Sequence, residues 1–298
     1  MKIELLTPDL YALGEGPLWD VEEQRFYWLD CHNDTIYRST AEGKEIESWK
    51  TPTTIGSMAL RKSGGALVSL RTGLHFFDFK SGKFDPVGPN PEAGMENIRL
   101  NDGKVDHQGR FLVGSYDESM FGPNPSPTPR GSLYRLDTDL TLTKLETGIG
   151  VSNGPCWSPD GKIFYFCDTI ADVVWAYDYD TATGTPSNKR DFARGFGTYG
   201  MPDGATVDSE GYLWNAWNGP GLGGGDVRRY APDGTLDRRL QLPSHKVTSL
   251  AFGGPNLDIL YVTTMNLPGF PEDRREDGYT FKVTGLGVRG MPEPRFGG

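Results

Sequence analysis

The stretch Glu15-Gly-Pro-Leu-Trp19-Asp20 sets a plan that recurs along the chain: an oxygen-bearing side chain, an apolar residue four positions later, then Asp or Ser. Three further copies follow it, and they read Asn101…Val105-Asp106, Asn153…Trp157-Ser158 and Asp203…Val207-Asp208. Two weaker copies, Gly56…Leu60-Arg61 and Thr248…Phe252-Gly253, keep the spacing without the oxygen-bearing side chain. The copies begin at positions 15, 56, 101, 153, 203 and 248, which are 41 to 52 residues apart. Repeats of this length, with several strands each, are typical of β-propellers.

The segments within each repeat also have β character. Short aromatic and β-branched runs such as 25–30 and 162–167 are followed by a second apolar run, with turn residues between them. No window of a dozen residues has a helical period. We therefore predict an all-β, six-bladed propeller formed by residues 1–298 as a single domain. The leading strand, residues 2–6, is expected to complete the last blade beside 279–283.

Two insertions interrupt the repeats. Residues 117–131 are rich in proline and residues 218–225 are rich in glycine, so both are expected to form loops rather than strands. Either loop can be a lid over a site or a plain surface connection.

Composition restricts the partners and the location. The net charge of −10 argues against a nucleic-acid or anionic-membrane surface. The chain has no run of 18 apolar residues, and its first residues do not resemble a signal peptide. The three cysteines lack Cys-x-x-Cys spacing, so we expect free, mostly buried thiols in a reducing cytoplasm.

The oxygen-bearing residues of the repeat, Glu15, Asn101, Asn153 and Asp203, should face one another where the innermost strands begin. Asn or Asp before Gly is also an ordinary turn feature. That explanation covers one such residue but not four at the same repeat position. Oxygen ligands suit a divalent cation, for which calcium, magnesium, manganese, zinc and ferrous iron are candidates; oxygen favours the hard cations over a thiolate-type zinc site. The sequence thus predicts one central metal site with room for water or substrate.

Arg99 precedes Asn101 by two positions, so strand alternation places both side chains on the same side. A guanidinium there can bind hydroxyl or carbonyl oxygens of a polar substrate. The alternative is a salt bridge to Asp102 or another neighbouring carboxylate.

Four segments carry a resemblance to a known family: Leu13–Trp19, Arg99–Asp106, Ser152–Pro155 with Ser158–Gly161, and Met201–Gly204. Together they resemble the regucalcin (senescence marker protein)/gluconolactonase family over essentially the whole chain. The resemblance implies a six-bladed propeller with one catalytic divalent cation, in a family whose bacterial members hydrolyse sugar lactones.

Carried over residue by residue, the resemblance implies metal ligation by Glu15, Asn153 and Asp203 and substrate contact by Arg99 and Asn101. The position of a substrate-contacting Glu in the vertebrate branch is Ser119 here. This departure leaves Glu118 or Asp117 as the acidic side chain, and we take Glu118 as the candidate.

The resulting hypothesis is a cytoplasmic lactonase that hydrolyses a sugar lactone to the aldonic acid, with Asp203 as metal ligand and general base. Its partner is the small-molecule lactone, and a monomer or weak homo-oligomer is expected. Two alternatives stay open. One is a calcium-binding regulatory or scaffold propeller with a structural ion, and the other is a related metal-dependent esterase or organophosphate hydrolase.

Overall fold

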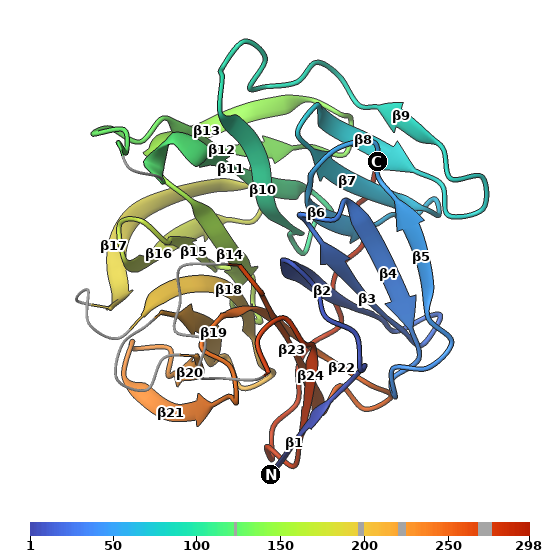
Figure 1. The fold of residues 1–298 in the computed structure, drawn as a ribbon. Helices are drawn as coiled ribbons and strands as arrows, with labels where there is room; N and C mark the ends of the chain where they lie inside the picture. Colours follow the sequence, from blue (N-terminus) through green and yellow to red (C-terminus); the bar gives the residue numbers. More distant parts are fainter. Residues whose placement is uncertain (122–123, 196–199, 220–224, 268–275) are drawn as a thin grey trace.

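The computed structural model describes residues 1–121, 124–195, 200–219, 225–267 and 276–298. Six four-stranded antiparallel sheets, the blades, follow one another around a ring (Figure 1). Blade 1 contains β2 (Gly14–Asp20), β3 (Arg25–Asp30), β4 (Thr35–Ser39) and β5 (Glu47–Lys50), and blade 2 contains β6 (Ile55–Leu60), β7 (Ala66–Leu70), β8 (Gly73–Phe77) and β9 (Phe84–Pro86). Blade 3 contains β10 (Ile98–Val105), β11 (Phe111–Asp117), β12 (Gly131–Leu136) and β13 (Leu142–Ile149). The predicted six-bladed, all-β fold is confirmed.

The second half of the ring has the same order. Blade 4 contains β14 (Ser152–Trp157), β15 (Ile163–Asp168), β16 (Val173–Asp180) and β17 (Thr185–Arg194). Blade 5 contains β18 (Met201–Val207), β19 (Leu213–Asn218), β20 (Asp226–Tyr230) and β21 (Leu236–Gln241). Blade 6 contains β22 (Val247–Gly253), β23 (Ile259–Thr264) and β24 (Phe281–Thr284), and its fourth strand is β1 (Lys2–Leu5).

The ring is closed by the two ends of the strand sequence. β1 pairs antiparallel with β24, and Leu5 lies opposite Phe281. The expected completion of the last blade by the leading strand is therefore confirmed. Because the first strand and the last strand of the chain lie in one sheet, a ladder of backbone hydrogen bonds closes the ring.

Helical structure in the described ranges is limited to one 3-10 turn, η1 (Glu118–Met120). No helix among those ranges is long and apolar enough to span a membrane. Of the two predicted insertions, 117–131 connects β11 to β12 and 218–225 connects β19 to β20. Residues 122–123 and 220–224 lie outside the described residues.

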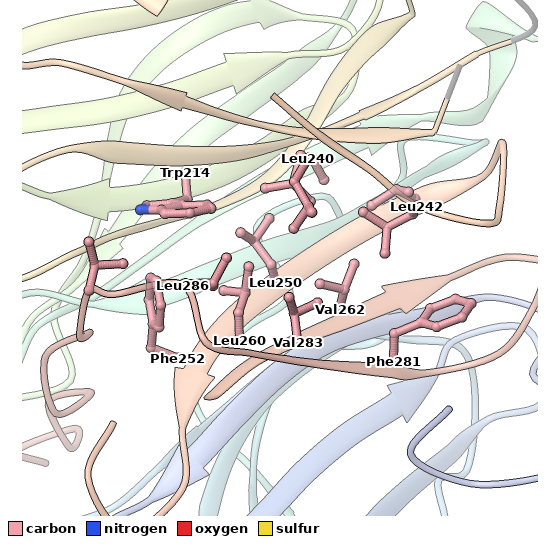
Figure 2. Close-up of a cluster of buried hydrophobic side chains, with 14 residues drawn as sticks. Trp214, Leu240, Leu242, Leu250, Phe252, Leu260, Val262, Phe281, Val283 and Leu286 are labelled. Carbon is pink, nitrogen blue, oxygen red and sulfur yellow. The ribbon is translucent and has the colours of Figure 1, made fainter. Parts of the chain in front are cut away.

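Apolar layers between neighbouring blades form the core. Between blades 5 and 6, Trp214 and Leu240 pack against Leu250, Phe252 and Val262 (Figure 2). Each middle strand is covered on both faces by adjacent blades, which is why runs such as Phe26–Asp30 are buried without alternation. Cys31, Cys156 and Cys167 are all buried and free, as expected.

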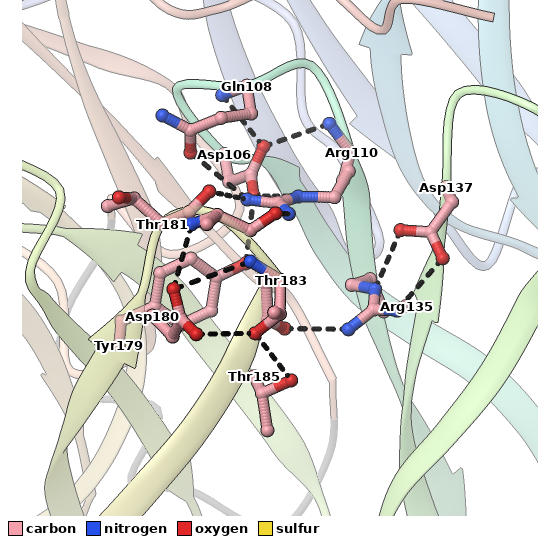
Figure 3. A network of polar contacts seen from close by, with 12 residues as sticks. Asp106, Gln108, Arg110, Arg135, Asp137, Tyr179, Asp180, Thr181, Thr183 and Thr185 are labelled. Atoms are coloured by element: carbon pink, nitrogen blue, oxygen red, sulfur yellow. Dashed lines mark hydrogen bonds and ion pairs between the residues drawn. The ribbon is translucent and has the colours of Figure 1, made fainter.

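The Asp or Ser that closes each strong copy of the repeat holds the hairpin between the first two strands of its blade. The Asp106 carboxylate accepts the backbone amides of Gln108 and Arg110, both at 2.9 Å. It also accepts the Arg110 guanidinium at 2.6 Å and the Tyr179 hydroxyl of blade 4 at 2.8 Å (Figure 3). Asp208 caps the amides of Glu210 and Tyr212 in the same way. This half of the repeat is therefore structural.

The first residue of each repeat lies where the hydrogen-bond ladder between the first two strands of the blade is irregular. In all six first strands, the pairing register with the second strand shifts at the first residue of the repeat or beside it. First strands of adjacent blades contact one another around the ring. Such a bulge turns one residue out of the regular alternation, here towards the ring axis.

The segment after β24 crosses the far side of the channel and ties several blades together. Gly290 pairs with Asp208 of blade 5, and Phe296 pairs with Arg61 of blade 2 and is fully buried beside blade 3. Glu293 of this segment accepts the Lys104 ammonium at 2.9 Å. We call residues 289–298 the C-terminal strap; it closes the channel opposite the candidate site.

Candidate active site

Four oxygen-bearing side chains from four blades meet at the channel. Glu15 comes from β2, Asn101 from β10, Asn153 from β14 and Asp203 from β18. The Asn101 side-chain amide donates to Asn153 Oδ1 at 3.0 Å, and the charge of Glu15 acts on Asp203. The structure thus brings together the four residues that the repeat singled out.

Each of the two asparagines is oriented by hydrogen bonds. Asn101 Nδ2 also donates to the Ser152 carbonyl at 2.9 Å, and Asn101 Oδ1 accepts Arg99 Nη1 at 2.8 Å. Asn153 Nδ2 donates to Thr169 Oγ1 at 2.9 Å. Because these donors are committed, Asn153 presents its oxygen rather than its nitrogen to the channel.

Asp203 is held from one side only. Its Oδ2 accepts Asn218 Nδ2 at 2.7 Å. Its Oδ1 is buried and has no hydrogen-bond partner among the described residues. A buried, unpaired carboxylate oxygen is costly unless a cation, a proton or a ligand satisfies it.

The acidic groups in the channel raise one another's pKa values. Burial and the neighbouring Asp102 carboxylate raise the pKa of Glu15 to about 8. Burial, with the charges of Glu15 and Asp102, holds the pKa of Asp203 well above its usual range. A bound cation would oppose both effects, because an opposite charge favours the ionised carboxylate.

Asp102 is a third acid in the channel, but its oxygens are already used. One oxygen accepts the Gly103 amide and the other accepts the Gly154 amide, both at 2.8 Å. Asp102 therefore fixes β14 beside β10 immediately after Asn153. Its carboxylate is not the partner of Arg99, and the salt bridge that the sequence analysis gave as the alternative for Arg99 is formed with Glu118 instead.

The donor set fits a hard divalent cation. Within the described ranges there is no group of three or more His, Cys, Asp or Glu side chains able to hold a metal. The candidate set instead combines the carboxylates of Glu15 and Asp203 with the amide oxygen of Asn153. The unpaired Asp203 oxygen supports a site of this kind, since all-oxygen sets suit calcium, magnesium or manganese.

The two weak copies of the repeat contact the neighbouring strands that carry site residues. A Cβ on Gly56 would lie 2.5 Å from the Leu100 carbonyl and 2.7 Å from Asn101 Cα, so only glycine allows this approach. Thr248 donates its hydroxyl to the Gly14 carbonyl, one residue before Glu15. These blades therefore position the neighbouring strands that carry acceptor residues.

Arg99 and Glu118 lie side by side at the mouth of the channel. Arg99 is 3% exposed, and its Nε donates to Glu118 Oε1 at 3.2 Å. Arg71, which the sequence analysis did not identify, donates to the same oxygen at 2.5 Å. Glu118 is thus gripped by two guanidinium groups.

Asp117 has a different environment from Glu118. Its carboxylate is buried, accepts the Ser119 amide and hydroxyl, and forms an ion pair with Arg130 at 2.8 Å. Of the two acids that the sequence left open, only Glu118 contacts Arg99. The 3-10 turn η1 separates them by directing successive side chains apart.

Comparison with known proteins places this architecture in a family. The model of the SMP-30/gluconolactonase/LRE-like region matches residues 13–266. The chain belongs to this family. It is 34% identical over 303 residues to regucalcin of Xenopus laevis, with 100% of this chain and 99% of the relative covered.

Two further relatives of this family carry lactonase names. Pentonolactonase XacC of Haloferax volcanii is 38% identical over 267 residues, covering 89% of this chain and 85% of the relative. The 6-deoxy-6-sulfogluconolactonase of Pseudomonas putida is 35% identical over 292 residues, covering 96% of each.

Solved structures of the family agree with the fold. A luciferin-regenerating enzyme superposes with a TM-score of 0.91 at 30% identity over 99% of each chain. A regucalcin from Agrobacterium tumefaciens, described as a calcium-binding protein, superposes with a TM-score of 0.88 at 27% identity, covering 98% of this chain and 96% of its own.

Three residues that support the candidate site were not identified from the sequence. Thr169 follows the second strand of blade 4, Asn218 ends that of blade 5, and Arg71 follows that of blade 2. One signal was available. The second strands of blades 1, 3 and 4 all end in Asp, so that end of the strand is polar around the ring.

Proposed function

We propose that this protein is a metal-dependent lactonase that hydrolyses a sugar lactone to the aldonic acid. The observation that carries the proposal is the buried oxygen of Asp203 that has no hydrogen-bond partner among the described residues. The charge of Glu15 acts on Asp203, and Asn153 is linked through Asn101 to the polar group of Arg99 and Glu118. The lactonase names of two relatives support the choice of substrate class.

The proposed chemistry follows from the residues. A lactone is a cyclic ester, and attack by water converts its carbonyl group to a tetrahedral oxyanion. A divalent cation held by Glu15, Asn153 and Asp203 would supply the positive charge that stabilises this oxyanion. Asp203, which a bound cation would keep ionised, accepts the proton of the attacking water.

Substrate orientation falls to the residues at the mouth. Arg99 donates hydrogen bonds to ring hydroxyls, and Glu118 accepts one. Asn101, whose amide already donates to Ser152 and Asn153, offers its oxygen as a further acceptor. Because Arg99 is nearly fully buried and bonded to Asn101, its guanidinium is already fixed before substrate arrives. Such fixed groups would hold the lactone carbonyl at the candidate metal site without further ordering.

The test is a panel of pentono-, hexono- and deoxyhexono-lactones assayed with metal-stripped protein. Hydrolysis should be absent without metal and return on addition of calcium, magnesium, manganese, zinc or ferrous iron, one of which will be best. Asp203→Ala should abolish turnover while the protein stays folded. Full turnover by metal-free protein would disprove the proposal.

A second candidate function is supported by the regucalcin relative described as calcium-binding. If the ion were only structural, calcium would raise the melting temperature and no lactone would be consumed. An esterase or organophosphate hydrolase is less favoured, because Arg71, Arg99 and Glu118 make the mouth strongly polar. We keep a cytoplasmic monomer or weak homo-oligomer as part of the proposal.

A further inference from the structure

Tyr116 of β11 lies between the two halves of the candidate site. It pairs across the sheet with Arg99 of β10 and forms a β-bridge with Val151, two residues before Asn153. Tyr116 is therefore placed where the substrate-orienting group meets the strand that carries a candidate metal ligand. Neither the repeat nor the family resemblance singled it out.

The ring of Tyr116 is fixed by its neighbours. The Arg99 guanidinium carbon lies 4.5 Å from the ring centroid, which is a cation–π contact. The Phe121 ring packs edge-on, with its centroid 5.5 Å away. Because the guanidinium covers one face of the ring, that face is not available for stacking on a sugar.

The hydroxyl of Tyr116, by contrast, has no hydrogen-bond partner among the described residues and is not enclosed. Burial raises the pKa of Tyr116, and the charges of Glu118 and Asp203 add to the effect while Arg99 opposes it. The pairing of Tyr116 with Arg99 and Val151 places the residue beside the channel, and the raised pKa keeps the phenol proton in place. The Tyr116 hydroxyl is therefore a neutral hydrogen-bond donor.

We propose that Tyr116 is a specificity-determining substrate contact, whose hydroxyl hydrogen-bonds one particular hydroxyl group of the bound lactone. This inference rests on the proposed lactonase function and adds a residue to its site. A neutral donor suits a sugar hydroxyl because the hydroxyl accepts the bond without a charge having to be buried.

The test compares Tyr116→Phe, which removes only the hydroxyl, with wild-type protein on lactones that each lack one hydroxyl. We expect KM to rise roughly three- to tenfold on the full lactone, the effect of one hydrogen bond, and kcat to change little. The rise should disappear for the one deoxy-lactone that lacks the contacted hydroxyl, as in a double-mutant cycle. Melting temperature and divalent-metal affinity should be unchanged.

Tyr212→Phe is the matched control. Tyr212 also carries a guanidinium over its ring, with Arg229 at 3.6 Å, but it lies in the turn between β18 and β19, at the end of β18 away from Asp203. Removing its hydroxyl should leave the KM for every lactone unchanged.

Two results would overturn the inference: equal KM for wild type and Tyr116→Phe on all lactones, or an identical rise on all of them. The second result would mean that Tyr116 acts only through Arg99. Calorimetric binding of an aldonolactam, which is not hydrolysed as a lactone, provides the same comparison without turnover. Binding weakened by Tyr116→Phe in a protein that hydrolyses no lactone would support this contact while rejecting the proposed function.

Discussion

Asn101 of blade 3 donates its side-chain amide to Asn153 Oδ1 of blade 4 at 3.0 Å. Both residues lie at the irregular point of their first strand, where the ladder shifts register. The contact joins a candidate substrate-orienting residue to a candidate metal ligand. Metal binding and substrate orientation, the two roles proposed for the site, would therefore be coupled across a blade boundary.

Asn101→Ala should weaken metal binding although Asn101 is not assigned as a ligand. Without its amide, the Asn153 side chain loses one of the bonds that aim its oxygen at the channel. Partners of metal ligands typically affect affinity by about 10- to 100-fold when removed. Calorimetric titration of metal-stripped protein with calcium measures the change. Unaltered affinity would show that Asn153 is oriented by Thr169 alone.

The metal-free protein should lose stability as pH rises from about 4.5, the ordinary value for Glu15, to about 8, its value in the folded chain. Over this range the folded state holds a proton that the unfolded state has released, so the free energy of unfolding falls with pH. Urea denaturation at several pH values measures the slope.

Glu15→Gln is the control for that slope, because the amide does not titrate. It should reduce the loss of stability over the same pH window. A parallel pH dependence in wild type and Glu15→Gln would contradict the assignment of the slope to Glu15. Metal binding should release protons in the same window, since Glu15 must ionise to act as a ligand.

The fold was predictable from the sequence because six copies of one pattern implied six equivalent units. The register shift in each first strand was not predictable, because register belongs to a pair of strands rather than to one. Glu15, Asn101, Asn153 and Asp203 could nevertheless be placed together, since equivalent positions of a ring face the same axis.

The residues that hold the site side chains in place could not be predicted in the same way. Arg71 and Asn218 contact Glu118 and Asp203 from the ends of the second strands of blades 2 and 5, which lack the Asp that ends the second strands of blades 1, 3 and 4. The choice between Asp117 and Glu118 depended on a single 3-10 turn that begins after Asp117. The turn directs the two successive side chains apart. Local backbone geometry of this kind is not encoded in the spacing of residues.

Glu118→Gln should raise KM for the lactone by roughly tenfold and leave metal affinity unchanged. The substitution removes the negative charge shared by Arg71 and Arg99 and frees Arg99 to move. Hydrogen bonds between charged groups contribute about 1.5–3 kcal/mol, so the loss of orientation should be measurable in steady-state kinetics. Asp117→Asn is the comparison: it should lower the melting temperature through Arg130 and Ser119 and change KM little. The reverse pattern would assign the substrate contact to Asp117.

Phe296→Ala should destabilise the whole ring, although Phe296 is the third residue from the end of the chain. Its side chain is fully buried with Phe111 and Leu67, between blades 2 and 3, and the C-terminal strap reaches that position after contacting blades 5 and 6. Truncating a buried phenylalanine typically costs about 3–5 kcal/mol. Urea denaturation should show this loss, whereas Leu236→Ala, at a side chain that is 50% exposed, should change stability little. A loss below about 1 kcal/mol for Phe296→Ala, the range of ordinary surface changes, would mean that the strap is not needed to hold the ring closed.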